Sequence, residues 1–407
     1  MLLLLWYLFG TRAFWDFEFN QLIQLKTGNY DKAHPVFHTI FCGGLLKIYQ
    51  SLHTIAFAQI IAFSVALYSI CWWAKRSGLS IIYACGAIVG IVVFTYPYAH
   101  YVVKDSFMLS SFIIATTGLM AWNQRPDLTS AILAAIGLTG VGLFRYDGQA
   151  SVLLVSIAVV TLSIWNKKIR KQAYIIAFIP LLALVSGHLI LPACVNARSE
   201  MTGTKLAMPA DLICEVIVRG GDISPDDLKK AEQLIMPKEL MFHLHKLGHE
   251  YQGEKYIWGM GFADNKEFKR YSFAYNLKDK GAELLPLCGR VIIKNPVITI
   301  QHLFQQGKML WDIRAEHDRS VYIKSPINPI SLCFYMGMLV LILIIRNRCG
   351  IQYLLSFIPF ITVTSVIALI ATTYEMRYGL PIIPAGILAI GYARTLIRHN
   401  DCGKAEA

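Results

Sequence analysis

Long apolar runs separated by short polar loops are the dominant pattern along the chain. Runs of about 15 to 22 residues recur, which is the length an α-helix needs to cross the hydrocarbon core of a bilayer. The runs do not alternate between polar and apolar positions, so they predict helices and exclude a β-barrel. Residues 36–50 have helical apolar spacing broken by polar residues, which is typical of a helix lying on the membrane surface, with a re-entrant segment as the alternative. We expect ten spans, at about residues 1–15, 54–74, 79–97, 106–122, 129–144, 149–165, 173–193, 329–345, 352–373 and 379–395.

The composition agrees with a membrane protein. Of the 407 residues, 55% are hydrophobic and only 16% are charged, whereas a soluble domain carries about a quarter of charged residues. Lipid-exposed backbone must satisfy its own hydrogen bonds, so we expect an all-α polytopic membrane fold. The nine cysteines are scattered and include no C-x-x-C pair. The cysteine pattern therefore assigns neither a metal site nor a disulfide.

Basic residues are concentrated in alternate loops. By the positive-inside rule these loops are cytoplasmic, which places both termini inside. A cytoplasmic loop needs only positive charges without acidic partners to set the orientation of the chain. Membrane topology therefore explains the net charge of +12, and no nucleic-acid partner is expected. The basic residues that follow even-numbered spans are Lys75 and Arg76, Arg125, Lys167, Lys168, Arg170 and Lys171, Arg346 and Arg348, and Arg394, Arg398 and Lys404.

One long insertion, residues 194–328, interrupts the apolar pattern. Long loops translocate regardless of their charge, so we expect it on the outer side. Ser224-Pro225-Asp226-Asp227 provides an N-cap, a proline in the first turn and acids at the positive end of a helix dipole. A second helix is expected from Pro237 to Leu247, and an amphipathic stretch from Val297 to Trp311. The pattern thus predicts an N-terminal transmembrane module at 1–193, a small, mostly helical extracytoplasmic domain at 194–328, and a C-terminal transmembrane module with a short tail at 329–407.

The loops on the predicted outer side carry paired charges. One interpretation is that each pair is a local surface salt bridge, which contributes little. The other is that the loops converge, so that Lys104, Arg145 and Arg377 hold a phosphate while Asp16 or Asp105 accepts a proton from an attacking hydroxyl. A phosphate site beside a base at the membrane edge indicates sugar transfer from a polyprenyl-phosphate donor. The loops contain Asp16 and Glu18 with His34, Lys104-Asp105, Arg145-Tyr146-Asp147, and Glu375-Met376-Arg377-Tyr378.

These motifs resemble those of the GT-C superfamily of integral-membrane glycosyltransferases. Asp16-Phe17-Glu18 is similar in type and place to the acidic motif of the first outer loop. His34-Pro35 resembles the His-Pro of the protein mannosyltransferase and aminoarabinose transferase branches, although Val36 stands where a second proline is common. Lys104-Asp105 looks like the acidic site of the second loop, and residues 375–378 are similar to a late-loop motif of bacterial members. The resemblance covers most of the helical part but not residues 194–328.

The resemblance implies a GT-C-like fold and transfer of a sugar from a polyprenyl-phosphate donor to a glycan, lipid or protein acceptor. The expected location is the outer face of a bacterial inner membrane. Some branches use a divalent metal at the acidic motif, but two carboxylates do not complete a cation site, so metal binding by Asp16 and Glu18 stays open and no other cofactor is expected. In this scheme Asp16 is the base, with Asp105 second and Glu18 beside it, and the substrate-binding residues are His34, Lys104, Arg145, Tyr146, Glu375, Arg377 and Tyr378.

Two other functions fit a chain of this kind. A transporter of lipid-linked sugars would place ionisable residues near mid-membrane, but the expected spans are nearly free of acids. His188 is the main exception, and we interpret it as a polar residue satisfied within the helical bundle. An O-antigen or polysaccharide polymerase or ligase also combines many spans with a large outer loop, and it is favoured by arginine-rich loops without a first-loop acidic motif. The spacing of His243, His245 and His249 suggests zinc. No cysteine or further histidine completes a tetrahedral set, so we interpret this segment as a solvated helix.

Overall fold

The computed structural model is almost entirely helical in the part of the chain that it describes, so the expected all-α fold class is confirmed. The exception is a parallel pair of two-residue strands, in which β1 (Arg12–Ala13) lies beside β2 (Tyr101–Val102). The described residues are 12–13, 20–32, 34–99, 101–102, 104–198, 203–252, 277, 280–306, 329–346, 351–370 and 380–405.

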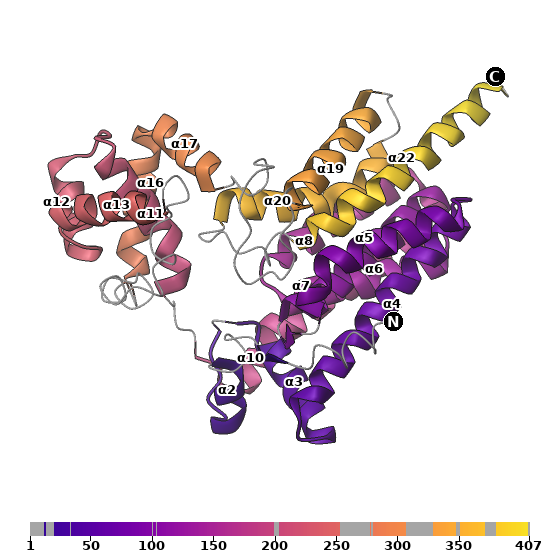
Figure 1. The fold of residues 1–407 in the computed structure, drawn as a ribbon, viewed down its shortest axis with the longest axis horizontal. Helices are drawn as coiled ribbons and strands as arrows, with labels where there is room; N and C mark the ends of the chain where they lie inside the picture. The colour runs from indigo at the N-terminus through magenta and orange to yellow at the C-terminus, as the bar shows by residue number, and fades with distance from the viewer. Residues whose placement is uncertain are drawn as a thin grey trace. The chain divides into compact units, whose positions relative to one another are not determined.

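The helices form two compact units (Figure 1). The first unit joins the N-terminal helices to α19, η5, most of α20, and α22, so the N-terminal and C-terminal apolar regions pack as one body. Its helices are α2 (Leu22–Thr27), α3 (Val36–Ile48), α4 (Leu52–Arg76), α5 (Ile81–Ala99), α6 (Lys104–Gln124), α7 (Leu128–Phe144), α8 (Gly148–Trp165), η2 (Lys167–Ile169), α9 (Arg170–Val185), η3 (Ser186–Ile190), α10 (Leu191–Cys194), α19 (Pro329–Arg346), η5 (Ile351–Phe357), α20 (Ile358–Ile370) and α22 (Ile382–Ala405).

Three helical segments of the first unit are long and apolar enough to cross a membrane. They are Leu52–Arg76, Gly148–Trp165 and the continuous run Lys167–Cys194. Shorter apolar helices coincide with the expected third, fifth, eighth, ninth and tenth spans, whereas α6, at the place of the expected fourth span, belongs to neither group. Their length and composition are compatible with a membrane protein, while ten spans and a GT-C fold stay predictions.

The expected first span, residues 1–15, is wrong where it can be compared. Most of it lies outside the described residues, but Arg12–Ala13 form strand β1 instead of a helix. The backbone of these two residues pairs with Tyr101–Val102 of β2. Their hydrogen-bonding groups are thus satisfied by a distant segment, which apolar periodicity does not reveal.

Helix α6 is the central helix of the first unit. It contacts α4, α7, α22 and η5, and nearly every residue from Asp105 to Asn123 is buried. A helix that is apolar all round belongs in such a core. Glycines allow α6 and α7 to cross closely, because a side chain at Gly118 would collide with the backbone of Ala134, and one at Gly137 with that of Ala115. Small residues are the usual means by which membrane helices approach each other.

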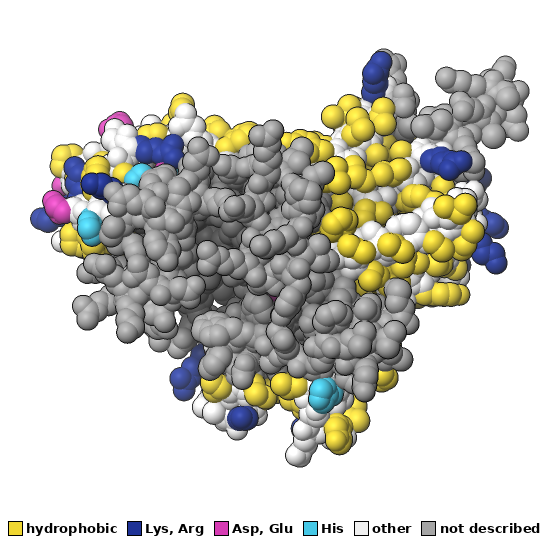
Figure 2. Space-filling view, viewed as in Figure 1, with side chains coloured by type: hydrophobic (Ala, Val, Ile, Leu, Met, Phe, Trp, Pro, Cys, Tyr) yellow, Lys and Arg dark blue, Asp and Glu magenta, His cyan; other side chains and the backbone are white. Residues whose placement is uncertain are grey.

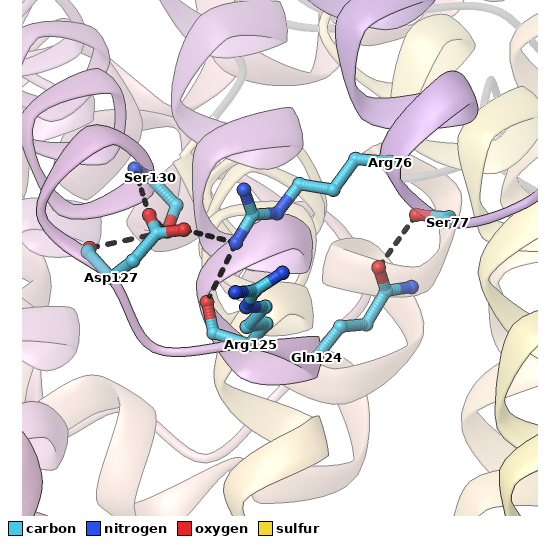
Figure 3. A network of polar contacts seen from close by, with 6 residues as sticks. All are labelled: Arg76, Ser77, Gln124, Arg125, Asp127 and Ser130. Carbon is cyan, nitrogen blue, oxygen red and sulfur yellow. Dashed lines mark hydrogen bonds and ion pairs between the residues drawn. The ribbon is translucent and has the colours of Figure 1, made fainter.

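One end of the first unit is tied together by a polar network (Figure 3). Asp127 caps α7 by accepting a hydrogen bond from the Ser130 amide at 2.9 Å, and its second oxygen pairs with Arg76 at the end of α4. Burial opposes ionisation of Asp127, but the bonds from Ser130 and Arg76 outweigh it and hold its pKa below the ordinary value. Ser77 donates to Gln124 at 2.6 Å. The loops after α4 and α6 therefore lie together, as the alternating topology requires, although Arg76 is paired and not the bare cation expected.

The surface of the first unit is rich in exposed apolar side chains. Ile82 of α5 is 80% exposed and Leu339 of α19 is 59% exposed, and neighbouring apolar residues on these helices are exposed as well. Figure 2 shows hydrophobic side chains gathered over the region of α5, α19 and α22. Soluble monomers rarely expose contiguous apolar patches larger than a few hundred Å². This surface has the composition expected of one that faces lipid.

The second unit is a small helical body built around α11. Helices α16 and α17 pack on α11, and its core includes Ile213, Met241 and Leu287. The helix predicted at Ser224 begins there, with the Ser224 hydroxyl accepting from the Asp227 amide at 3.2 Å. The outer location of this unit stays a prediction. Its helices are α11 (Gly203–Val218), α12 (Pro225–Leu234), α13 (Lys238–Gln252), α16 (Gly281–Lys294) and α17 (Pro296–Gln306).

Candidate functional site

A buried ion pair joins two of the charged loops. Arg145 follows the last residue of α7 and pairs with Asp105 in the first turn of α6, 40 positions earlier. Its Nε also donates to Asp147 at 2.8 Å. Asp105 is 2% exposed and Arg145 is 7% exposed. Burying two charges is costly unless they are paired and hydrogen-bonded, so this arrangement fixes the start of α6 against the α7–α8 turn.

A second pair joins the loop before α3 to the start of α6. Lys104 Nζ donates to His34 Nδ1 at 2.9 Å, and both side chains are partly buried. Pro35 lies between His34 and the first residue of α3, where its fixed φ suits the entry to a helix. Lys104 and Asp105 are adjacent in the first turn of α6, so the two pairs are neighbours. The part of the predicted convergence that involves His34, Lys104, Asp105 and Arg145 is therefore present in the structure.

Tyr146 holds the His34 loop in place. Its hydroxyl lies 3.1 Å from the carbonyl oxygen of Lys32 and 3.0 Å from that of His34, and it donates to them. Burial, with a smaller effect of the Asp31 charge, raises the pKa of Tyr146 to about 12. The phenol is thus neutral near pH 7 and serves as a hydrogen-bond donor. Tyr146 thereby links the α7–α8 turn to the segment that carries His34.

The remaining predicted site residues lie outside the described part of the chain. They are Asp16, Glu18, Glu375, Arg377 and Tyr378, and their roles stay predictions. One structural link leads toward the first of them: β1 ends three residues before Asp16 and pairs with β2, which ends two residues before Lys104. Among the described residues no group of three or more His, Cys, Asp or Glu could hold a metal ion. Metal binding by Asp16 and Glu18 is not tested by this observation.

Polar residues that the sequence did not assign to the site lie behind these pairs. His38 is fully buried on α3, with Nδ1 2.7 Å from Gln21 Oε1. His188 lies in the π-helical segment η3, where Nε2 donates to the Gly142 carbonyl at 2.8 Å, and its ring centre is 5.2 Å from that of Tyr146. The interpretation of His188 as a satisfied bundle residue agrees with this bond. A π-helical turn is common at functional sites, but it has no signal in a single sequence.

The arrangement can bind an anion, and it gives Lys104 and His34 a different role from Arg145. Lys104 and His34 are partly buried and present a cation beside a ring nitrogen, which suits a phosphate group. Arg145 lies between two carboxylates, Asp105 and Asp147, so its charge is already neutralised. Its geometry fits the positioning of Asp105 better than direct contact with a phosphate.

A second ionic cluster, which the sequence analysis missed, is buried in the second unit. His302 of α17 donates from Nε2 to Asp211 of α11 at 2.7 Å, and its Nδ1 lies 3.8 Å from Glu215. Glu215 also accepts from Arg219 Nε at 2.5 Å. Burial disfavours the charged ring, but Asp211 and Glu215 outweigh it and raise the pKa of His302 to about 10. Acids and a histidine on different helices of an unmatched domain gave no motif that could have identified this cluster.

The histidines suspected of zinc binding belong to α13. His245 Nε2 lies 3.7 Å from Glu215 Oε2, and His243 is exposed. The side chain of His249 is outside the described set. His245 therefore joins the buried ionic cluster.

Comparison with known proteins adds no homologue to these observations. No protein-family model, no curated protein and no solved structure matches this chain. Function is therefore inferred from the residues of the site and from the motif resemblance.

Proposed function

We propose that this protein is a membrane glycosyltransferase of the GT-C type, which moves a sugar from a polyprenyl-phosphate donor to a hydroxyl of a glycan, lipid or protein acceptor. The observation that carries the proposal is the convergence of His34, Lys104, Asp105, Arg145 and Tyr146. Separate local salt bridges would leave each pair within its own loop. Here Arg145 reaches Asp105, and Lys104 reaches His34, across 40 and 70 positions of the chain.

The proposed reaction assigns one task to each group. Lys104 and His34 bind the donor phosphate, and the Lys104 ammonium stabilises the negative charge that grows on the phosphate as the bond to the sugar breaks. Arg145 keeps Asp105 in place at the edge of that site. Asp16 accepts the proton of the acceptor hydroxyl while the oxygen of that hydroxyl forms the new bond to the anomeric carbon. Ten spans, a site on the outer face and cytoplasmic termini are parts of the same proposal.

The test is transfer of labelled sugar by the purified protein from candidate polyprenyl-phosphate sugars, with hydrolysis and transfer counted separately. Asp16→Asn keeps the size of the side chain but loses its proton affinity. A positioned base contributes about 10²–10⁴-fold, so we expect transfer to fall by that factor while the donor still binds. Asp16→Glu retains part of the activity, because the carboxylate survives but is displaced by one methylene.

Two further variants locate the phosphate contact and provide a control. Lys104→Gln should raise the apparent KM for the donor and also lower kcat, because it removes a charge contact that binds the donor phosphate and becomes stronger as the phosphate gains negative charge. Asp226→Asn, on the exposed surface of α12, should leave turnover unchanged. Normal turnover of Asp16→Asn would contradict the assigned base. The polymerase or ligase alternative would then gain, with Arg145 and Arg377 as its first candidates.

A further inference from the structure

The turn between α8 and α9 carries a dense group of cations. Lys167, Lys168, Arg170 and Lys171 all lie in η2 or the first turn of α9, and all four are exposed. Within the described part of the chain, none of these four side chains forms an ion pair or a hydrogen bond. Arg76, the last residue of α4, is by contrast paired with Asp127. The α8–α9 turn is thus an uncompensated basic patch.

The local sequence supplies no counter-charge to this patch. Residues 148–199 contain no aspartate and no glutamate. Like charges three or four residues apart on a helix repel each other, and Lys167 and Lys171 have this spacing. Anions from outside the chain that bind beside these cations would relieve this repulsion.

The surroundings of the patch are apolar and exposed. The patch directly follows the run Gly148–Trp165 and forms the start of the run Lys167–Cys194, which are two of the three helical runs suited to crossing a membrane. Next to the cations, Ile164 is 65% exposed and Trp165 is 77% exposed, and Tyr174 is 44% exposed one turn further along. Tryptophan and tyrosine collect at the membrane–water interface. A turn that joins two spans and is flanked by these rings lies at the depth of lipid headgroups.

We infer that residues 164–171 form a binding site for the headgroups of anionic phospholipids. The lysines and Arg170 contact the lipid phosphates, and Trp165 and Ile164 contact the upper part of the acyl chains. Basic segments immediately beside a membrane helix attract anionic lipids in this way. The positive-inside rule concerns orientation during insertion and requires no bound lipid, so preferential lipid binding is a separate property. It does not depend on the proposed catalytic activity.

The test uses Trp165 as a reporter in the full-length protein. The protein is placed in nanodiscs that contain a minority of phosphatidylglycerol in phosphatidylcholine, with bromine on the acyl chains of one lipid or the other. Quenching specific to Trp165 is the difference between wild type and Trp165→Phe. We expect brominated phosphatidylglycerol to quench Trp165 more strongly than brominated phosphatidylcholine at the same mole fraction, with the preference declining at high salt.

Matched variants decide whether the patch causes that preference. Each cation near an anionic surface contributes roughly fivefold in binding, so the double variant Lys167→Gln and Lys168→Gln should weaken the preference by at least about tenfold. Lys75→Gln, which replaces an exposed lysine in the last turn of α4, should leave it unchanged. Equal quenching by the two lipids in wild type would overturn the inference, as would a preference that survives the double variant or falls equally with Lys75→Gln. Loss of the preference on adding inorganic phosphate at constant ionic strength would instead indicate a site for the free ion.

Discussion

At the scale of single residues, Arg145 shows how an expected role changes with tertiary context. Its pairing with Asp147, two positions away, is visible in the sequence and is present. Its pairing with Asp105 also joins two of the loops that were predicted to converge. This pairing neutralises the guanidinium that was expected to bind a phosphate. Lys104 and His34 were predicted in the same site, and they are left as the more exposed cationic pair. Residue types and spacing were therefore sufficient to predict that the loops of His34, Lys104 and Arg145 meet, but not to divide the roles among these residues.

The buried His302 makes the stability of the second unit depend on pH. Its pKa is about 10 in the folded protein, against about 6.5 in an unfolded chain. A raised folded-state pKa contributes stability that is complete below pH 6.5 and is lost as the pH rises through 10. Breaking a buried ionic pair costs about 3–5 kcal/mol. We therefore expect His302→Gln to lower the melting temperature strongly at pH 6 and by much less near pH 10.

The reactivity of Cys214, which is fully buried in the core of this unit, reports its melting in the full-length protein. Wild type and variant are compared at the same pH, so the effect of pH on the ionisation of the Cys214 thiol is the same in both and does not contribute to the difference between them. His243→Gln, on the exposed face of α13, is the control and should show no pH-dependent difference. A difference between wild type and His302→Gln that stays constant from pH 6 to 10 would contradict a charged His302.

At the scale of secondary-structure elements, long apolar runs were sufficient to predict the helices from α4 onward in the first unit. They failed at Arg12–Ala13, where pairing with Tyr101–Val102 forms a strand. They also gave no sign of the π-helical segment η3, which depends on a local change of hydrogen-bond register. The inserted domain was expected at residues 194–328, whereas the compact unit is Ser199–Leu310 together with a later part of the chain, Ser365–Glu375. Contacts distant in sequence decided each of these features.

The close crossing of α6 and α7 predicts a strong effect of a single methyl group. Gly137→Ala places a Cβ against the backbone of Ala115, which cannot yield as a side chain would. Overpacking of this kind costs about 1–3 kcal/mol. Gly44→Ala on α3 is the matched control, because nothing lies within 4 Å of the new Cβ, and alanine in a helix is favoured by about 0.5–1 kcal/mol.

Thermal unfolding of the two variants in the same detergent measures the difference. We expect a lower melting temperature for Gly137→Ala and an equal or higher one for Gly44→Ala. Because α6 carries Lys104 and Asp105 while α7 leads to Arg145, Gly137→Ala should also weaken donor binding at the candidate site. Equal melting temperatures for the two variants would contradict the close helix crossing.

At the scale of the whole molecule, the two ends of the first unit differ in their polar residues. One end joins the loops after α4 and α6 through Arg76, Ser77, Gln124 and Asp127 (Figure 3). The other end joins the start of α6 to the end of α7 through Asp105 and Arg145. The sequence predicted this alternation from the positions of its basic loops, since each span reverses the direction of the chain. The distribution of Lys and Arg between the loops at the two ends, and not the packing within the unit, determines which end faces the cytoplasm.

The orientation of the protein is the last prediction, and the proposed function depends on it. Positive-inside topology places Lys75 in the cytoplasm and Lys229 of α12 outside, and both side chains are exposed. Cys85 and Cys194 are exposed as well, so the parent protein carries Cys85→Ser and Cys194→Ser. In intact cells, an impermeant thiol reagent should label Lys229→Cys, and it should label Lys75→Cys only after the membrane is permeabilised. The reverse pattern would place the Lys104–His34 pair on the cytoplasmic side, where the donor proposed here would meet the wrong face of the enzyme.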